Sequence, residues 1–395
     1  MTGNAVEPTQ NLRTSPRWLH WVNLFWNILV FLGAGSLSLV LFRWNPETGA
    51  DPFVRQLSNR TVLIWAYMCG FVALMAIIAL VDSLMRLMGR AKPSRSNHAG
   101  WIKFTIILFP LLAVALDAWK YSIILPDWVF SLLVFLGVLI PVVWLVRMAS
   151  GHLWGRHKGR GASIISFSGT VTIPLIILIQ GLLMVIGFML LVFFGLQGLA
   201  EFSGSLAEIE EILASPLVIL GIVTFLSIIA PLVEELLKTL VVFPLLGLGI
   251  SEGDGYVAGL MSGGAFALLE GALYAAQTAQ APGGEWAYFL IGRLGGTLIH
   301  VFNGGLVGWA LAKTWKDRNF ARLVVIYLTA FFIHGIWNLV AALTQLIPGM
   351  LNQEVNEISS AVILTIIAAL TGVGFFYFAR HILRIDKHMR VNRVA

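Results

Sequence analysis

Long apolar segments are the feature that most constrains the fold of this chain. Ten stretches carry few or no charged side chains, at residues 19–42, 61–81, 104–125, 128–148, 172–200, 216–247, 256–279, 291–312, 322–344 and 358–380. A helix of about 20 apolar residues crosses the hydrocarbon core of a bilayer and satisfies its own backbone polar groups there. Only 12% of the residues are charged. We therefore expect an all-α polytopic membrane protein with about ten transmembrane helices.

The distribution of basic residues predicts the orientation of these helices. With the N-terminus inside, 20 of the 26 lysines and arginines fall in inner segments, and only Arg43, Arg55, Arg60 and Lys120 fall in outer ones. Basic residues favour the cytoplasmic side of a membrane, so both termini are expected there. Because these residues lie in short loops between spans, they favour the lipid bilayer as a partner and argue against nucleic-acid binding.

Four spans near the C-terminal end carry ionisable side chains at mid-membrane depth. The sixth span has Glu234, Glu235 and Lys238, the seventh Glu270, the eighth His300 and the ninth His334. Each charge at the centre of a membrane helix costs about 2.5–3.5 kcal/mol on insertion scales, so such residues face each other or a water-filled cavity. The same spans are rich in small residues, which let helices approach closely. We expect these four helices to form a tightly packed bundle with a polar centre.

Spacing suggests how the polar side chains are shared among the helices. Adjacent helical residues point about 100° apart, so Glu234 and Glu235 cannot both face one site squarely. Lys238 is within ion-pair reach of either acid. Pro231, just before them, removes a backbone hydrogen bond and can open the helix. Asn303 follows His300 by three residues and Asn338 follows His334 by four, so each amide can share a face with its histidine.

Glutamate and histidine around buried water suit a hydrolytic or metal site. A carboxylate shielded from water can act as a general base, and a neutral imidazole can bind a metal or assist an oxyanion. The chain has no Gly-x-Ser-x-Gly and no His-Glu-x-x-His sequence that would compete for the role. Two other classes stay open on the residues alone. One is a proton- or cation-coupled membrane transporter, and the other is a catalytically silent membrane scaffold.

The polar residues resemble a known family of membrane enzymes. Glu234-Glu235-Leu-Leu-Lys238, Phe266-Ala-Leu-Leu-Glu270, His300 in its glycine-rich helix and His334-Gly-Ile-Trp-Asn338 occur in the order and helix placement of the PrsW intramembrane proteases. That family falls within the wider group of CAAX prenyl endopeptidases and abortive-infection proteins. One departure is Gly271, where the family commonly has asparagine.

The resemblance implies an intramembrane endopeptidase in a bacterial plasma membrane, acting on membrane-embedded or membrane-proximal protein or peptide substrates. Glu234 or Glu235 would be the general base, and Glu270, His300 and His334 would complete the catalytic set. The resemblance leaves open a metal-dependent and a metal-free mechanism. In the first, a divalent metal, with zinc as the candidate, would be held by His300, His334 and Glu270; in the second, a glutamate would activate water with the same residues around it. Lys238, Asn303 and Asn338 would support these residues.

The apolar spans and the resemblance together divide the chain into four parts. Residues 1–18 form a cytoplasmic N-terminal segment, and residues 19–200 form a five-helix membrane region to which we assign no chemistry. Residues 216–345 form the PrsW-like core. Residues 346–395 form the last transmembrane helix and a basic cytoplasmic tail. The residues give no expectation for the oligomeric state.

Overall fold

The computed structural model describes residues 16–44, 52–90, 100–120, 125–195, 215–280, 285–346 and 353–394. Within these ranges every regular element is a helix, and no strand occurs. Nine helices of the described part are long and apolar enough to cross a membrane. The expected all-α polytopic membrane protein is thereby confirmed. Most of the expected N-terminal segment, residues 1–15, lies outside the described residues.

Nine of the ten expected spans correspond to these long helices, and two of the nine are interrupted. The elements are α1 (Arg17–Arg43), α2 (Pro52–Leu87), α4 (Asp127–Ser150), η2 (Gly151–His157), α5 (Lys158–Phe167), η3 (Ser168–Thr172), α6 (Ile173–Gly195), α8 (Pro216–Thr224), η5 (Phe225–Ile229), α9 (Ala230–Lys238), η6 (Leu240–Val242), α10 (Phe243–Leu246), α11 (Glu252–Gln280), α12 (Trp286–Asp317), α13 (Phe320–Leu346) and α14 (Gln353–Val394). The sixth expected span is broken after Thr239 by the 3-10 turn η6. The other interruptions are the π-helical turns η3 and η5. Such turns are rare and often mark functional sites.

The third expected span, 104–125, is shorter than the other nine. It consists of η1 (Gly100–Ile107) and α3 (Leu108–Trp119), whose apolar helical part is Phe104–Trp119. Arg60 near the start of α2 pairs with Asp127 at the start of α4, at 3.0 Å, so both helices begin at the same end of the bundle. The chain between them must return across the bundle, and η1 and α3 lie in that stretch. A tenth membrane crossing stays a prediction.

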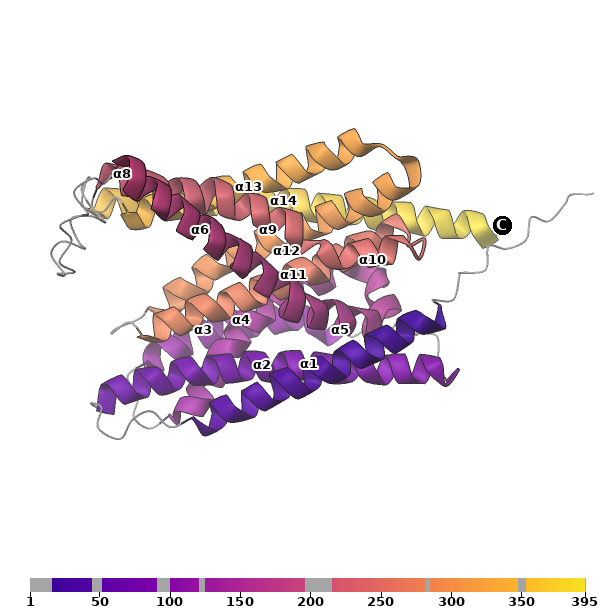
Figure 1. Cartoon of the computed structure of the whole chain (residues 1–395), viewed down its shortest axis with the longest axis horizontal. Helices are drawn as coiled ribbons and strands as arrows, with labels where there is room; N and C mark the ends of the chain where they lie inside the picture. Colours follow the sequence, from indigo (N-terminus) through magenta and orange to yellow (C-terminus); the bar gives the residue numbers. More distant parts are fainter. Residues whose placement is uncertain are drawn as a thin grey trace, which may run out of the picture.

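The centre of the bundle is formed by α11 and α12, which are the most buried long helices. Figure 1 shows them between α1 and α2 on one side and α13 and α14 on the other. By contrast, α6 and α14 are largely exposed, and α6 packs mainly on α8 and α9. Exposed apolar side chains cover the outer helices, as expected for surfaces that face lipid.

Glycines bring α11 and α12 into backbone contact, in agreement with the close approach expected from the small residues. A Cβ atom on Gly259 would overlap the carbonyl oxygen of Gly304, and one on Gly263 would overlap the carbonyl oxygen of His300. The two helices therefore exclude any larger residue at these points. This contact fixes the position of His300 relative to α11, which carries Glu270.

Basic side chains gather at one end of the bundle. Lys313 at the end of α12 pairs with Glu252 at the start of α11, at 3.2 Å, and Arg322 pairs with Asp317 at 2.6 Å. His152 after α4 contacts Asp386 near the end of α14, at 3.0 Å. The α14 C-terminal part thus lies at the end where α4 finishes. We call this the basic end of the bundle.

Candidate active site

Helix α9 is a short segment that presents three ionisable side chains to the interior. It starts after the π-helical turn η5, carries Pro231 in its first turn and ends at Lys238, where Thr239 leaves helical geometry. The missing N–H of proline and the widened turn both loosen the helix before the acids. Glu234, Glu235 and Lys238 are all buried. The expected opening at Pro231 therefore takes the form of a π turn followed by nine helical residues.

Glu235 binds both a lysine and a histidine. Its Oε1 atom accepts hydrogen bonds from Lys238 Nζ and His334 Nδ1, each at 2.8 Å. All three side chains are at most 1% exposed. Because an ionised carboxylate only accepts hydrogen bonds, the proton of a neutral His334 ring lies on Nδ1. The other ring nitrogen, Nε2, then presents a lone pair.

Glu270 holds the second histidine from the opposite side. Its Oε2 atom accepts hydrogen bonds from His300 Nε2 and Arg293 Nη2, each at 2.7 Å. The Nδ1 atom of His300 lies 2.8 Å from Lys238 Nζ. An ammonium group can only donate, so Nδ1 is the acceptor and the proton of the ring lies on Nε2. Arg293 therefore forms an ion pair with Glu270.

Glu234 lies beside a different nitrogen of the His334 ring from the one that Glu235 binds. Its Oε1 atom accepts a hydrogen bond of 2.9 Å from Gln180 Nε2 on α6. Its Oε2 atom lies 3.7 Å from His334 Nε2, which is too long for a hydrogen bond. That oxygen is buried and has no hydrogen-bond partner in the described part of the chain. A buried acceptor opposite an imidazole lone pair leaves a place for a cation.

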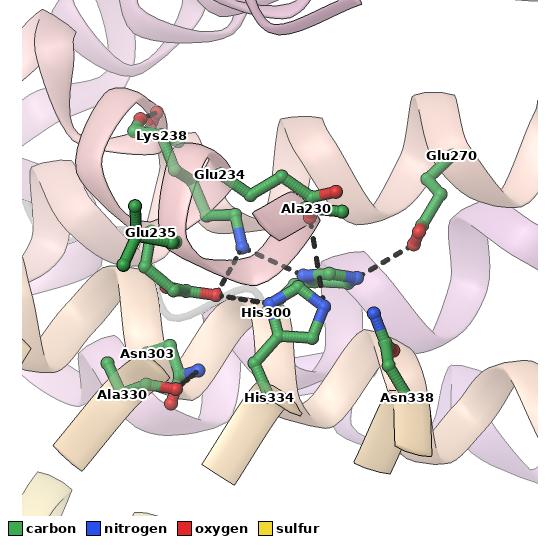
Figure 2. Close-up of polar contacts among 12 residues, drawn as sticks. Ala230, Glu234, Glu235, Lys238, Glu270, His300, Asn303, Ala330, His334 and Asn338 are labelled. Carbon is green, nitrogen blue, oxygen red and sulfur yellow. Dashed lines mark hydrogen bonds and ion pairs between the residues drawn. The ribbon is translucent and has the colours of Figure 1, made fainter. Parts of the chain in front are cut away.

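Figure 2 shows these contacts converging from four helices. Glu235 and Lys238 of α9, His300 of α12, His334 of α13 and Glu270 of α11 form one continuous chain of polar contacts. The ring centroids of the two histidines lie 4.8 Å apart. We call these residues, together with Glu234, the polar cluster. All five residues predicted to be catalytic from the sequence therefore meet in one place.

The two supporting asparagines lie beside the cluster and bind backbone. Asn303 Nδ2 donates to the carbonyl of Ala330 at 2.9 Å, and Asn338 Nδ2 donates to the carbonyl of Leu226 at 3.1 Å. Among the described residues neither amide is hydrogen bonded to a histidine. Asn303 therefore joins α12 to α13, and Asn338 joins α13 to the π turn before α9. They position helices that carry the cluster.

Sequence reasoning missed the contribution of α6. Gln180 is the one residue of the 23-residue helix α6 with a hydrogen-bonding side chain of its own, since the other residues are apolar or glycine. That isolation was the signal that could have found it, because a lone amide in an apolar helix needs a partner. Phe266 was noted only as a motif position. Its ring lies 4.6 Å from Lys238 Nζ and 5.0 Å from the His300 ring.

Glu234, His300 and His334 can supply the ligands of a metal ion. One donor atom from each lies within 4.8 Å of the others. Two histidines and one glutamate are a donor set known from catalytic zinc sites. Each histidine has a carboxylate on one nitrogen, Glu270 for His300 and Glu235 for His334, which is the usual support for metal-binding histidines. The remaining nitrogen of His334 is free, whereas Nδ1 of His300 accepts from Lys238 Nζ and would bind a metal only after that lysine released it. This group contains Glu234, whereas the set expected from the sequence contains Glu270, which accepts hydrogen bonds from Arg293 and His300. The expected set stays a prediction.

A family comparison agrees with this geometry. A family model described as PrsW family intramembrane metalloprotease matches residues 173–371, just over half of the chain. The chain belongs to the PrsW family. No curated protein and no solved structure matches it.

The match to the PrsW family is wider than the block 216–345. It begins at the start of α6 and ends within α14, and so includes Gln180 as well as the polar cluster. The protein is therefore an integral membrane protein of an intramembrane protease family. The departure at Gly271 has a packing reason in this chain, because a Cβ atom there would overlap the side chain of Val138 on α4.

Proposed function

We propose that this PrsW protein is a metal-dependent intramembrane endopeptidase that cleaves membrane-embedded or membrane-proximal proteins. The observation that carries the proposal is the Oε2 atom of Glu234, which has no hydrogen-bond partner among the described residues. This atom lies opposite His334 Nε2 and beside the buried His300. A buried carboxylate oxygen without a partner is costly. A divalent cation, with zinc as the candidate, would satisfy it.

The ion would be held by Glu234, His300 and His334. When bound, it would supply Lewis-acid polarisation of the scissile carbonyl and of the attacking water. The chain itself prepares this site. Gln180 fixes the Oε1 atom of Glu234 and so turns its other oxygen towards His334. Glu270 and Glu235 fix the orientation and the tautomer of the two imidazoles.

Glu235 is the candidate general base of the reaction. With Glu234 used as a ligand, the Oε2 atom of Glu235 is the buried carboxylate oxygen of the cluster that still has no hydrogen-bond partner among the described residues. Lys238, at 2.8 Å, keeps this carboxylate ionised by its charge. We assign to Glu235 the acceptance of a proton from water and to Lys238 the role of its counter-ion.

The cluster is more accessible from the side of Glu270. The side chains of Glu270 and Arg293 are 19% and 16% exposed, compared with 1% for Glu235 and His334. Tyr274, whose ring lies 5.0 Å from the Arg293 guanidinium, is also exposed. We infer that the substrate approaches along this side, where α11 and α12 meet.

The decisive experiment separates the roles of the two adjacent acids. Purified wild type, Glu234→Gln and Glu235→Gln would each be tested for bound metal and for cleavage of a fluorogenic peptide library. We expect Glu234→Gln to lose both properties, because it removes a ligand. We expect Glu235→Gln to keep the metal, because the amide oxygen can still accept a hydrogen bond from His334. Its rate of peptide cleavage should fall by a factor of about 10² to 10⁴, because the general base is lost.

Three results would contradict the proposal. Cleavage by wild type that persists after complete chelation would exclude metal dependence. Metal retained by Glu234→Gln and lost by Glu235→Gln would exchange the two roles. If folded wild type cleaved nothing but moved protons into liposomes with a substrate, the transporter would replace the protease.

The orientation in the membrane is also a proposal. The basic end of the bundle would face the cytoplasm, because lysine and arginine are retained on that side during insertion. The contact of His152 with Asp386 places the last turns of α14 at this end. The first residues of α1 lie there as well, since Asn23 of α1 donates to Ser83 near the end of α2, at 2.6 Å.

A further inference from the structure

A groove at the basic end of the bundle has no part in the polar cluster. It lies between α1, α2, α5 and the segment formed by η6 and α10, and its volume is about 280 Å³. We call it the α1–α10 groove. Its wall is mainly apolar and includes Leu19, Trp26, Phe167, Pro244 and Leu248. Ligand sites in proteins are typically concave and mostly apolar, with a few polar groups that fix the ligand.

Two arginines supply the positive groups of the groove. Arg86 and Arg160 belong to its lining, together with His20 and a single acid, Asp82. Arg86 is already bound, with its Nε 2.8 Å from Asp82 Oδ2. Arg160 has no hydrogen bond or ion pair to any residue that the structure describes. Its charged neighbours are Asp254, Arg86 and Asp82, so it lies in the field of another arginine.

The remaining polar groups at the base of the groove are used within the protein. Asn23 Nδ2 donates to Ser83 at 2.6 Å and to Ser163 at 3.0 Å, which joins α1 to α2 and α5. The rings of Trp26 and Phe167 pack with their centroids 6.2 Å apart. The groove therefore offers guanidinium groups at its polar side and hydrocarbon elsewhere. An uncharged polar ligand would find few free partners in it.

We propose that the α1–α10 groove binds an anionic phospholipid. Arginine is suited to phosphate because its planar fork donates two parallel hydrogen bonds. A phosphate group would contact Arg160 and the free edge of Arg86, and part of an acyl chain would lie against the wall that contains Leu19 and Leu248. The apolar wall distinguishes this ligand from a free phosphate ion, which would gain nothing from it. A zwitterionic lipid would bring its own cation to two arginines.

The groove is adjacent to the segment that ends α9. Val241, Pro244, Leu245 and Leu248 line it, and Val241 follows Lys238 by three residues. A lipid bound there would pack against η6 and α10 and so support the end of the helix that carries Glu235 and Lys238. The lipid site itself does not rest on the proposed protease function, although its effect on cleavage does.

The test measures lipid retention by the full-length protein in detergent with native mass spectrometry. Phosphatidylglycerol and phosphatidylcholine would be offered together to wild type and to the double variant Arg86→Gln/Arg160→Gln. We expect wild type to retain phosphatidylglycerol and the variant to bind it about 30-fold more weakly, on the estimate for two basic residues at an anionic surface. The matched control is Arg380→Gln/Arg384→Gln, which removes two exposed charges of α14 and should change retention little.

A second variant tests the apolar half of the groove. Leu248→Trp keeps both arginines and fills the space against which the acyl chain would pack, so it should also lower retention. Equal retention of the two lipids by wild type, or an equal loss in the α14 control, would overturn the proposal. The proposal would also be overturned if inorganic phosphate raised the thermal midpoint of unfolding as much as phosphatidylglycerol does.

A substrate segment is the remaining occupant to exclude. If the groove held substrate, the groove variants would lose cleavage in detergent without any anionic lipid, and the lipid proposal would fall. Failure of the protease proposal gives a different result. Neither wild type nor any variant would then cleave peptide, while the Arg86→Gln/Arg160→Gln variant would still retain less phosphatidylglycerol than wild type.

Discussion

Each histidine of the polar cluster has a carboxylate on one ring nitrogen. The other nitrogen is free in His334 and accepts from Lys238 Nζ in His300. Glu270 occupies Nε2 of His300, and Glu235 occupies Nδ1 of His334. This arrangement fixes both tautomers without any metal, because a neutral imidazole that donates from one nitrogen can only accept at the other. At the scale of single residues, the chain therefore presents the lone pair of His334 Nε2 and the free oxygen of Glu234 to a common centre. The lone pair of His300 Nδ1 accepts a hydrogen bond from Lys238 Nζ at 2.8 Å.

Gln180 is expected to act through Glu234, to which its Nε2 atom donates at 2.9 Å; the same atom lies 3.4 Å from the carbonyl oxygen of Ala230. We predict that Gln180→Leu lowers metal affinity or cleavage by roughly 10- to 100-fold, the usual effect of losing a group that supports a metal ligand. The protein should remain folded, since leucine suits the apolar surroundings of α6. Metal competition with a chromogenic chelator and peptide cleavage would measure the two effects. Leu178→Ala, at an exposed position of the same helix, is the control, and an equal loss there would contradict the prediction.

Lys238 neutralises a buried acid. We predict that Lys238→Met lowers the free energy of unfolding by about 3–5 kcal/mol, because Glu235 would be left as an uncompensated buried charge. The double variant Glu235→Gln/Lys238→Met should recover much of this loss. Thermal unfolding of the three proteins in one detergent would give the comparison. If Lys238→Met were as stable as wild type, the lysine would not be the counter-ion.

At the scale of elements, two devices position the cluster. One is the backbone contact of α11 with α12, where glycines allow the approach that brings Glu270 to His300. The other is the broken sixth span, in which the π turn η5 precedes the nine residues of α9. Asn338 donates to the carbonyl of Leu226 within that turn. The irregular backbone is therefore held by a side chain from α13.

The contact of α11 with α12 can be tested with one methyl group. We predict that Gly263→Ala costs about 1–3 kcal/mol of stability, the usual range for overpacking, and reduces cleavage because its Cβ would displace the backbone of His300. Gly292→Ala is the matched control on α12, since a Cβ there meets no atom within 4 Å. Thermal unfolding and peptide cleavage should both separate the two variants. Equal behaviour would mean that the helices can move apart without cost.

At the scale of the whole molecule, the bundle separates its basic end from the opposite end. Arg60 and Asp127 mark one end, while Lys313, Asp317 and Arg322 mark the other. The parallel course of α2 and α4 requires the chain to cross the bundle between them. The short α3 and the preceding η1 therefore decide whether the protein has nine crossings or ten.

Cysteine labelling distinguishes these topologies. In a Cys69→Ala background, Asn319→Cys and Glu285→Cys should react with a membrane-impermeant maleimide from opposite sides of the membrane, because they flank α12. Arg90→Cys, after α2, and Leu125→Cys, before α4, should also react from opposite sides if η1 and α3 cross. Labelling of both from the same side would remove the tenth crossing. We expect Asn319→Cys to be protected in intact cells, since the basic end should face the cytoplasm.

The sequence predicted which side chains come together where the free-energy cost of an unpaired charge in the bilayer left few alternative arrangements. Glu234, Glu235, Glu270, His300 and His334 could be grouped because isolated ionisable residues in a bilayer are too expensive. The same reasoning could not tell which acid each histidine would bind, since several pairings remove the same cost. Nor could it reach Gln180, because a neutral amide costs much less than a charge and its position in α6 implies no particular partner.

By itself the sequence determined that the chain forms apolar membrane helices and that its buried charges must meet, because bilayer thickness and the cost of desolvation act on residues wherever they pack. Only the tertiary structure decided that Glu234 lies with the two histidines, that Glu235 and Glu270 hold their far nitrogens, and that α6 joins the cluster. Those choices depend on the rotation and the register of each helix against its neighbours. Rotation and register are set by contacts such as that of Gly263 with His300, between residues that are distant in the chain.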